Sequence, residues 1–197
     1  MDTPMEPLAA AIGPSGHSDA AHRLYTKRLG LWLFIASEAF LFAAAIAARF
    51  SILGDDRPAD INQPLGLVIS TILLTSSLTA YRAETAMAHD DLGGFLRNAT
   101  STMFLGGMFL VGVILEWSEG LRLFPPGTLF GSAFFALIGL HAFHVITGLI
   151  VLGIVRGMAK RGRFGAGDYW PVEGAVKYWH FVDVAWVFIF PTLYLVR

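Results

Sequence analysis

The sequence predicts an all-α integral membrane protein, a bundle of five transmembrane helices. Hydrophobic residues make up 55% of the 197 residues and charged residues only 15%, with a mean hydropathy of +0.59, which is more apolar than soluble domains usually are. Five stretches have about the 20 apolar residues that a helix needs to cross the hydrocarbon core. Polar, Gly and Pro residues separate these stretches, and no soluble domain fits between them.

Each apolar stretch predicts one membrane-spanning helix. The predicted spans are residues 29–50, 64–83, 98–117, 129–156 and 175–195. The fourth is long enough to tilt or to run past the membrane interface. Pro191 lies near the end of the fifth, where a lost backbone hydrogen bond costs least.

Residues 1–28 are predicted to form a mobile tail, because Pro, Gly, Ser and Ala dominate up to about Ala21. The tail is not expected to be a signal peptide, since its basic residues follow the weakly apolar stretch instead of preceding it. The first membrane helix is therefore expected to act as the targeting signal. Residues 29–197 make up the membrane domain.

The Lys and Arg residues predict the orientation of the bundle. Ten of the 14 fall in the tail and in the second and fourth loops, on one side of the predicted membrane. Because cytoplasmic loops carry an excess of Lys and Arg, we expect a cytoplasmic N-terminus. Five crossings then place the C-terminus outside.

Several ionisable groups fall at membrane depth, where each charge costs about 3 kcal/mol or more. They are Glu38, His141, His144, His180 and Asp183. Counted from the cytoplasmic helix ends, all lie in the inner half of the membrane. We therefore predict one polar cluster that forms if the first, fourth and fifth helices pack together.

His141 and His144 lie three positions apart and share one helical face. They could be half of a metal site, but such a site needs ligands from a second helix and no HExxH motif is present. Hydrogen bonds to neighbouring helices are the favoured interpretation. His180 and Asp183 also share a face; a proton relay or a carboxylate-supported ligand is one hypothesis, and a structural pair is the favoured one.

Glu38 is the strongest functional candidate, because its own helix offers no cationic partner within a turn or two. A carboxyl buried in this way can bind or pass a proton. It can equally be a protonated group that donates one interhelical hydrogen bond, and both interpretations stay open.

Other chemistries find no support in the sequence. The chain has no Cys, hence no thiolate metal site or covalent haem attachment. Phosphate-binding loops, nucleophile elbows and a set of His residues suited to two haems and a copper are missing as well. The net charge of −1 indicates no nucleic-acid partner. We expect no metal or redox centre in this chain.

Five segments resemble, in order, the signature segments of cytochrome c oxidase subunit III. They read LWLFIASEAFLF, LLTSSLTA, LEWSEG, HAFHVITGLI and KYWHFVDVAWVFIF. The resemblance runs from about Gly30 to Arg197, and the last segment is the most specific.

This resemblance implies roles for particular residues. The membrane-buried acid of the family falls on Glu38, and the acid that closes the third motif falls on Glu116, at the outer interface. The family's histidine-rich helix falls on His141 and His144, and its final motif falls on His180 and Asp183. Arg156, Lys160 and Arg161 fall where cations that bind lipid head groups are expected.

Subunit III in this family is not the catalytic subunit. The haems and the active-site copper belong to subunit I, and the dinuclear copper belongs to subunit II. The resemblance thus implies a multi-pass subunit in a bacterial plasma membrane that stabilises subunit I, binds phospholipid and supports proton uptake during oxygen reduction. Subunits I and II are the implied partners, with subunit IV and a larger respiratory assembly as further candidates. Longer members have seven helices, and the first two are absent here.

Alternatives follow from the same residues. The string YWHFVD favours the cytochrome c type over quinol oxidases, in which FWHFLD is more usual, and a homologue associated with nitric oxide reductase stays open. From other classes, the chain could be a proton-coupled transporter that uses Glu38, His144 and Asp183, although it lacks the internal repeat of many transporters. It could also be a His-ligated metal or haem protein.

Overall fold

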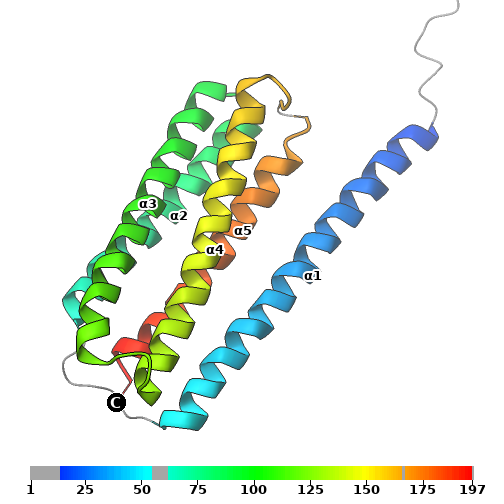
Figure 1. Ribbon diagram of the computed structural model, residues 1–197. Coiled ribbons are helices and arrows are strands. Elements are labelled where there is room, and N and C mark those ends of the chain that lie inside the picture. Colours follow the sequence, from blue (N-terminus) through cyan, green and yellow to red (C-terminus); the bar gives the residue numbers. More distant parts are fainter. Residues whose placement is uncertain (1–13, 55–61, 166, 197) are drawn as a thin grey trace, which may run out of the picture.

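The computed structural model describes residues 14–54, 62–165 and 167–196, and these form a bundle of long α-helices (Figure 1). The helices are α1 (Pro14–Leu53), α2 (Gln63–Ala88), α3 (Leu92–Leu123), α4 (Leu129–Lys160) and α5 (Trp170–Tyr194). Successive helices run in opposite directions, so α1 begins at one end of the molecule and α5 ends at the other (Figure 1). The described ranges contain no β-strand, and the prediction of an all-α fold is confirmed.

Each predicted span lies within one helix, apart from Leu195, which follows the last residue of α5. Helices α1 to α4 are long and apolar enough to cross a membrane. Helix α5, which carries Glu173, Lys177, His180 and Asp183, is not among these four. Its 25 residues still extend about 37 Å, which exceeds the roughly 30 Å of the hydrocarbon core.

Helix α1 begins earlier than the predicted span. Residues 14–28 of the predicted mobile tail are helical, and residues 1–13 of that tail lie outside the described residues. Ala, Leu, Lys and Arg, which favour helix, make up six of the 15 residues of this extension. A proline in the first turn, here Pro14, costs no internal hydrogen bond.

Side-chain oxygens cap the start of three helices. Asn62, Asp91 and Thr128 each accept a hydrogen bond from the backbone N–H three residues further along. Such caps satisfy backbone donors that have no partner in the first turn of a helix. They define where α2, α3 and α4 begin.

Helix α1 is the most loosely attached element of the bundle. It contacts α4 and α5, whereas α2 and α3 form a close pair on the far side. Towards its N-terminal end α1 leans away from the other helices (Figure 1). Most of its side chains are therefore exposed to the surroundings of the protein.

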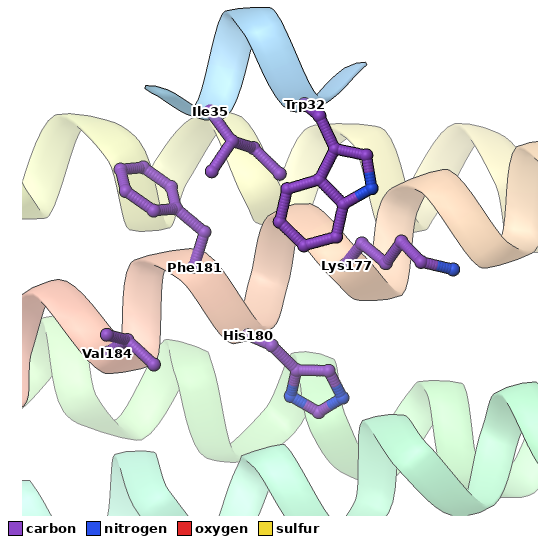
Figure 2. A pocket seen from close by; sticks show the side chains of 6 residues that line it. All are labelled: Trp32, Ile35, Lys177, His180, Phe181 and Val184. Carbon is purple, nitrogen blue, oxygen red and sulfur yellow. The ribbon is translucent and has the colours of Figure 1, made fainter. Parts of the chain in front are cut away.

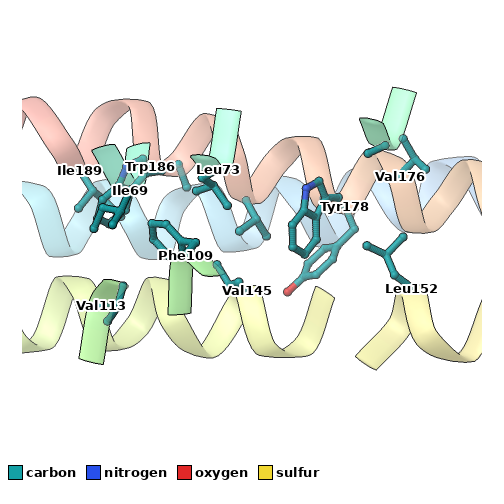
Figure 3. Packing of buried hydrophobic residues seen from close by; sticks show 14 of the residues in the cluster. Ile69, Leu73, Phe109, Val113, Val145, Leu152, Val176, Tyr178, Trp186 and Ile189 are labelled. Carbon is teal, nitrogen blue, oxygen red and sulfur yellow. The ribbon is translucent and has the colours of Figure 1, made fainter. Parts of the chain in front are cut away.

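Two tryptophans of α5 are bound to serines of α2. The indole N–H of Trp179 donates to Ser76 Oγ at 2.9 Å, and that of Trp186 donates to Ser70 Oγ at 2.8 Å. Both rings are fully buried, and Phe109 of α3 meets Trp186 edge to face with 4.9 Å between the ring centroids (Figure 3). A buried indole needs a hydrogen-bond acceptor, and in a membrane a hydroxyl on a neighbouring helix can supply it.

The ring of Trp179 is accommodated by two glycines. A Cβ atom on Gly106 of α3 would lie 2.6 Å from the ring, and one on Gly148 of α4 would lie 2.9 Å from it. Both distances are shorter than a normal carbon–carbon contact of about 3.5 Å. These two positions therefore let α3, α4 and α5 approach one another closely around a single large side chain.

We expect the Gly148→Val substitution to destabilise the bundle by about 1–3 kcal/mol, because the added atoms overpack the space of the Trp179 ring. Gly157→Val, on the same helix, is the matched control, since a Cβ at Gly157 would meet no atom within 4 Å. Thermal unfolding in mild detergent should show a lower midpoint for the first variant alone. Equal midpoints for the two variants would contradict this account of the packing.

Candidate functional site

Glu38 of α1 is hydrogen-bonded to His144 of α4. The distance from Glu38 Oε2 to His144 Nε2 is 3.1 Å, and the other ring nitrogen of His144 lies 2.8 Å from the carbonyl oxygen of Leu140. The Glu38 side chain is 21% exposed and that of His144 only 5%, so the pair sits at the edge of the bundle. Glu38 has no cationic partner on its own helix, and α4 supplies His144 instead.

The geometry of this pair requires a shared proton. Because His144 Nδ1 faces a carbonyl oxygen, it must carry a hydrogen and donate it. The contact between Nε2 and Glu38 then needs one further proton, either on the carboxyl or on the ring, since two lone pairs would otherwise face each other. The pair is neutral overall in both cases, which suits a position at membrane depth.

His141 lies in an aromatic environment and makes no hydrogen bond within the described part of the chain. Its ring is fully buried, with centroid distances of 4.8 Å to Trp186 and 5.5 Å to Phe109. The favoured expectation of a hydrogen bond to a neighbouring helix holds for His144 through Glu38 and fails for His141. In residues 14–54, 62–165 and 167–196, no group of three His, Asp or Glu side chains could hold a metal ion.

His180 and Asp183 are connected to α2 through Ser77. His180 Nδ1 lies 2.6 Å from Ser77 Oγ, and Figure 2 shows the ring pointing from α5 away from α1. Asp183 is 3% exposed, and neither carboxyl oxygen has a hydrogen-bond partner of ordinary geometry among the described residues. The Ser77 hydroxyl also approaches that carboxyl, so a single serine faces both ionisable groups.

The predicted cluster is divided between two sides of α5. Glu38 and His144 pair across α1 and α4, whereas His180 and Asp183 face α2 through Ser77. Ser77 was not among the residues predicted to form the cluster. The depth of a group along its helix does not specify the direction in which its side chain points.

Glu116 is buried near the end of the bundle at which α3 ends. Its side chain accepts a hydrogen bond from the phenol of Tyr194 on α5, and the residue is 4% exposed. Nearby, Asn62 Nδ2 donates to Glu119 Oε2 at 3.0 Å. The acid predicted at the outer interface thus binds the last turn of α5 to α3, a contact that no short-range pattern indicated.

A further ionic group joins the helices at the end where α1 begins. Arg28 of α1 lies 3.0 Å from Glu173 of α5, which also binds Lys177 one turn along. The guanidinium of Arg28 lies 6.0 Å from the centre of the Trp170 ring. The spacing of Glu173 and Lys177, four residues apart, is the signal that could have revealed part of this group.

The predicted head-group cations lie at the end of α4. Arg156 Nε donates to Thr100 Oγ1 at 2.9 Å, while Lys160 and Arg161 are exposed. None of the three is paired with a carboxylate within the described ranges. Their positive charges therefore stay available to an anion.

Comparison with known proteins places the chain in one family. The family described as cytochrome c oxidase subunit III matches residues 15–196. A protein of Corynebacterium diphtheriae named cytochrome c oxidase subunit 3 is 30% identical over 90% of this chain and 92% of its own length. A protein of Bacillus subtilis with the same name is 35% identical over 86% of each chain.

A longer relative shows the same similarity over part of its length. The cytochrome c oxidase subunit 3 of Podospora anserina is 32% identical over 84% of this chain and 66% of its own. These matches favour an oxidase subunit over an independent transporter or a His-ligated metal protein. With its apolar helices and its signature segments, the chain belongs to the cytochrome c oxidase subunit III family.

Proposed function

We propose that this chain is the non-catalytic third subunit of a cytochrome c oxidase in a bacterial plasma membrane, with a cytoplasmic N-terminus and five membrane crossings. It packs on subunit I, beside subunit II, and carries neither haem nor copper itself. Its family membership and its apolar helices support this assignment. The Lys and Arg residues gathered where α1 begins support the orientation.

The contact between Glu38 and His144 is the observation that carries the proposed role in proton uptake. Two protonatable groups from different helices share one proton at the edge of the bundle. Because the carboxyl is partly exposed, a water molecule or a side chain of a neighbouring subunit can reach it. Such a pair can release and rebind a proton without leaving an unpaired charge in the membrane.

The assignment predicts that the chain co-purifies with a haem-containing subunit. A tagged chain extracted in mild detergent should bring down partner chains that show a haem reduced-minus-oxidised difference spectrum. Mass spectrometry of those chains identifies subunits I and II. Absence of any haem-copper subunit from an intact preparation would contradict the proposed function.

We expect the Glu38→Gln substitution to preserve assembly, because glutamine keeps a hydrogen bond to His144. Proton uptake should slow by about two- to tenfold, less than the roughly 100-fold or more typical of groups that transfer a proton at the reacting centre. Inactivation during turnover should become correspondingly faster. Stopped-flow proton uptake by the purified oxidase measures the effect.

Ser37→Ala is the control for this variant. Ser37 neighbours Glu38, and among the described residues its hydroxyl bonds only the Phe34 carbonyl of its own helix. If proton uptake by Glu38→Gln matches that of the control and of the wild type, the role of Glu38 is purely structural.

The free cations at the end of α4 predict a phospholipid site. Replacing Arg156, Lys160 and Arg161 together by Gln should lower the anionic phospholipid retained per complex, because each cation contributes about 1 kcal/mol near a membrane surface. Lipid extraction and mass spectrometry of the purified oxidase measure the change. Arg122→Gln, at the other end of the bundle, should retain the wild-type amount; equal losses would refute a specific site.

A further inference from the structure

The outward side of α5 combines polar and apolar residues. Lys177 and His180 lie in its first half, followed by Val184, Val187 and Phe188, which are 53%, 47% and 63% exposed. These five residues are called the α5 face. It lies between α1 on one side and α2 on the other, because α5 packs against both.

His180 has an unmet hydrogen-bonding requirement at membrane depth. It is half-buried, and Ser77 occupies its Nδ1, while Nε2 has no partner in the described part of the chain. His180 lies five residues inside the predicted span of residues 175–195, which is about 7–8 Å along the helix axis. Unlike lysine or arginine, histidine has too short a side chain to reach the interface from there. Hydrocarbon around Nε2 would therefore be unfavourable.

The outward sides of α3 and α4 are different. Their most exposed large residues are apolar: Phe104, Val111, Ile114, Phe143, Ile150 and Ile154. A polar side chain there, Thr147, bonds the Phe143 carbonyl of its own helix at 2.9 Å. These surfaces are suited to lipid, whereas the first half of the α5 face, which carries Lys177 and His180, is not.

The α5 face is also hollowed. A cavity of about 350 Å³ lies between α1 and α5, bordered by Trp32, Ile35, Phe181 and three residues of the face. Figure 2 shows Trp32 and Ile35 reaching from α1 towards α5 above this hollow. A second cavity of about 440 Å³ shares Phe181 and Val184 and continues to Phe188. Side chains of an adjacent helix can fill such a groove.

Charged groups continue the polar region onto the neighbouring helices. Glu84 of α2 is half-buried and lies within electrostatic range of Lys177 and Glu173. Arg28 of α1 binds Glu173 from the other side. The first half of the α5 face is therefore surrounded by groups that a hydrogen-bonding protein surface would satisfy and lipid chains would not.

We infer that the α5 face is the surface on which this chain packs against a transmembrane helix of a partner oxidase subunit, which places a hydroxyl, amide or carboxyl group opposite His180 Nε2. A helix of another membrane-spanning chain can place such a group at this depth, whereas lipid tails cannot. The inference rests on the proposed function for the nature of the partner. The choice of face rests on the polarity of the chain itself.

Photo-crosslinking in the whole oxidase complex tests the choice of face. Benzoylphenylalanine is introduced at Val184 on the α5 face, or at Ile150 on the outward side of α4, positions of similar exposure at 53% and 57%. The Val184 variant should crosslink to a haem-containing subunit, and the Ile150 variant should give no subunit adduct. A subunit adduct from Ile150, or none from Val184, would overturn the inference.

Substitutions of His180 test the contact itself. His180→Leu should release the chain from the complex roughly three- to thirtyfold more readily, the change expected from losing one interhelical hydrogen bond. His180→Gln should restore most of the association, because glutamine can donate and accept. Detergent-challenge gels that follow the haem-containing subunit measure the retained chain.

Ser77→Ala separates this contact from the internal one. It removes the partner of His180 Nδ1 within the chain and should leave association close to that of the wild type. Equal release by Ser77→Ala and His180→Leu would show an internal role only and refute the docking contact. Should the wild-type chain itself retain no haem-containing subunit, the proposed function fails; retention with adducts from α4 refutes the α5 face alone.

Discussion

The two hydrogen bonds from Trp179 and Trp186 to the serines of α2 set the position of α5 within the bundle. Each bond joins a large buried ring to one neighbouring hydroxyl, so sliding or rotating α5 would leave two indole donors unpaired in a medium without water. Gly106 and Gly148 make room for the Trp179 ring, which allows α3 and α4 to close around it. Polar bonds specify the arrangement here, and close packing stabilises it.

With α5 held in this orientation, the ionisable groups fall into separate environments. Asp183 points towards α2 and is buried, whereas His180 lies closer to the outside. Glu38 and His144 meet on the other side, where α1 approaches α4. Because α1 is loosely attached, the Glu38 side chain of this pair stays partly exposed.

These environments keep the protonatable groups of the bundle apart from one another. The described side chains form no metal site, and the protonatable groups are paired or enclosed instead of converging on one cavity. The molecule presents lipid-compatible surfaces on α3 and α4 and a more polar surface on α5. Membership of the cytochrome c oxidase subunit III family implies that this chain associates with other oxidase subunits.

The sequence by itself determined the class of fold, the number of helices, their approximate limits and the family. Hydropathy, helix caps and motif order are local properties, and the physics behind them acts within one helix or one loop. The sequence also singled out Glu38, His144, His180 and Asp183, because a charged group at membrane depth is costly in whichever direction its side chain points. Only the tertiary structure decided the partners: His144 for Glu38, Ser77 for His180, an aromatic surrounding for His141, and Tyr194 for Glu116. A helix turns by about 100° per residue, so the facing partner depends on how each helix is rotated against its neighbours. That rotation is set by contacts between distant residues, such as Ser70 and Trp186, which are 116 positions apart.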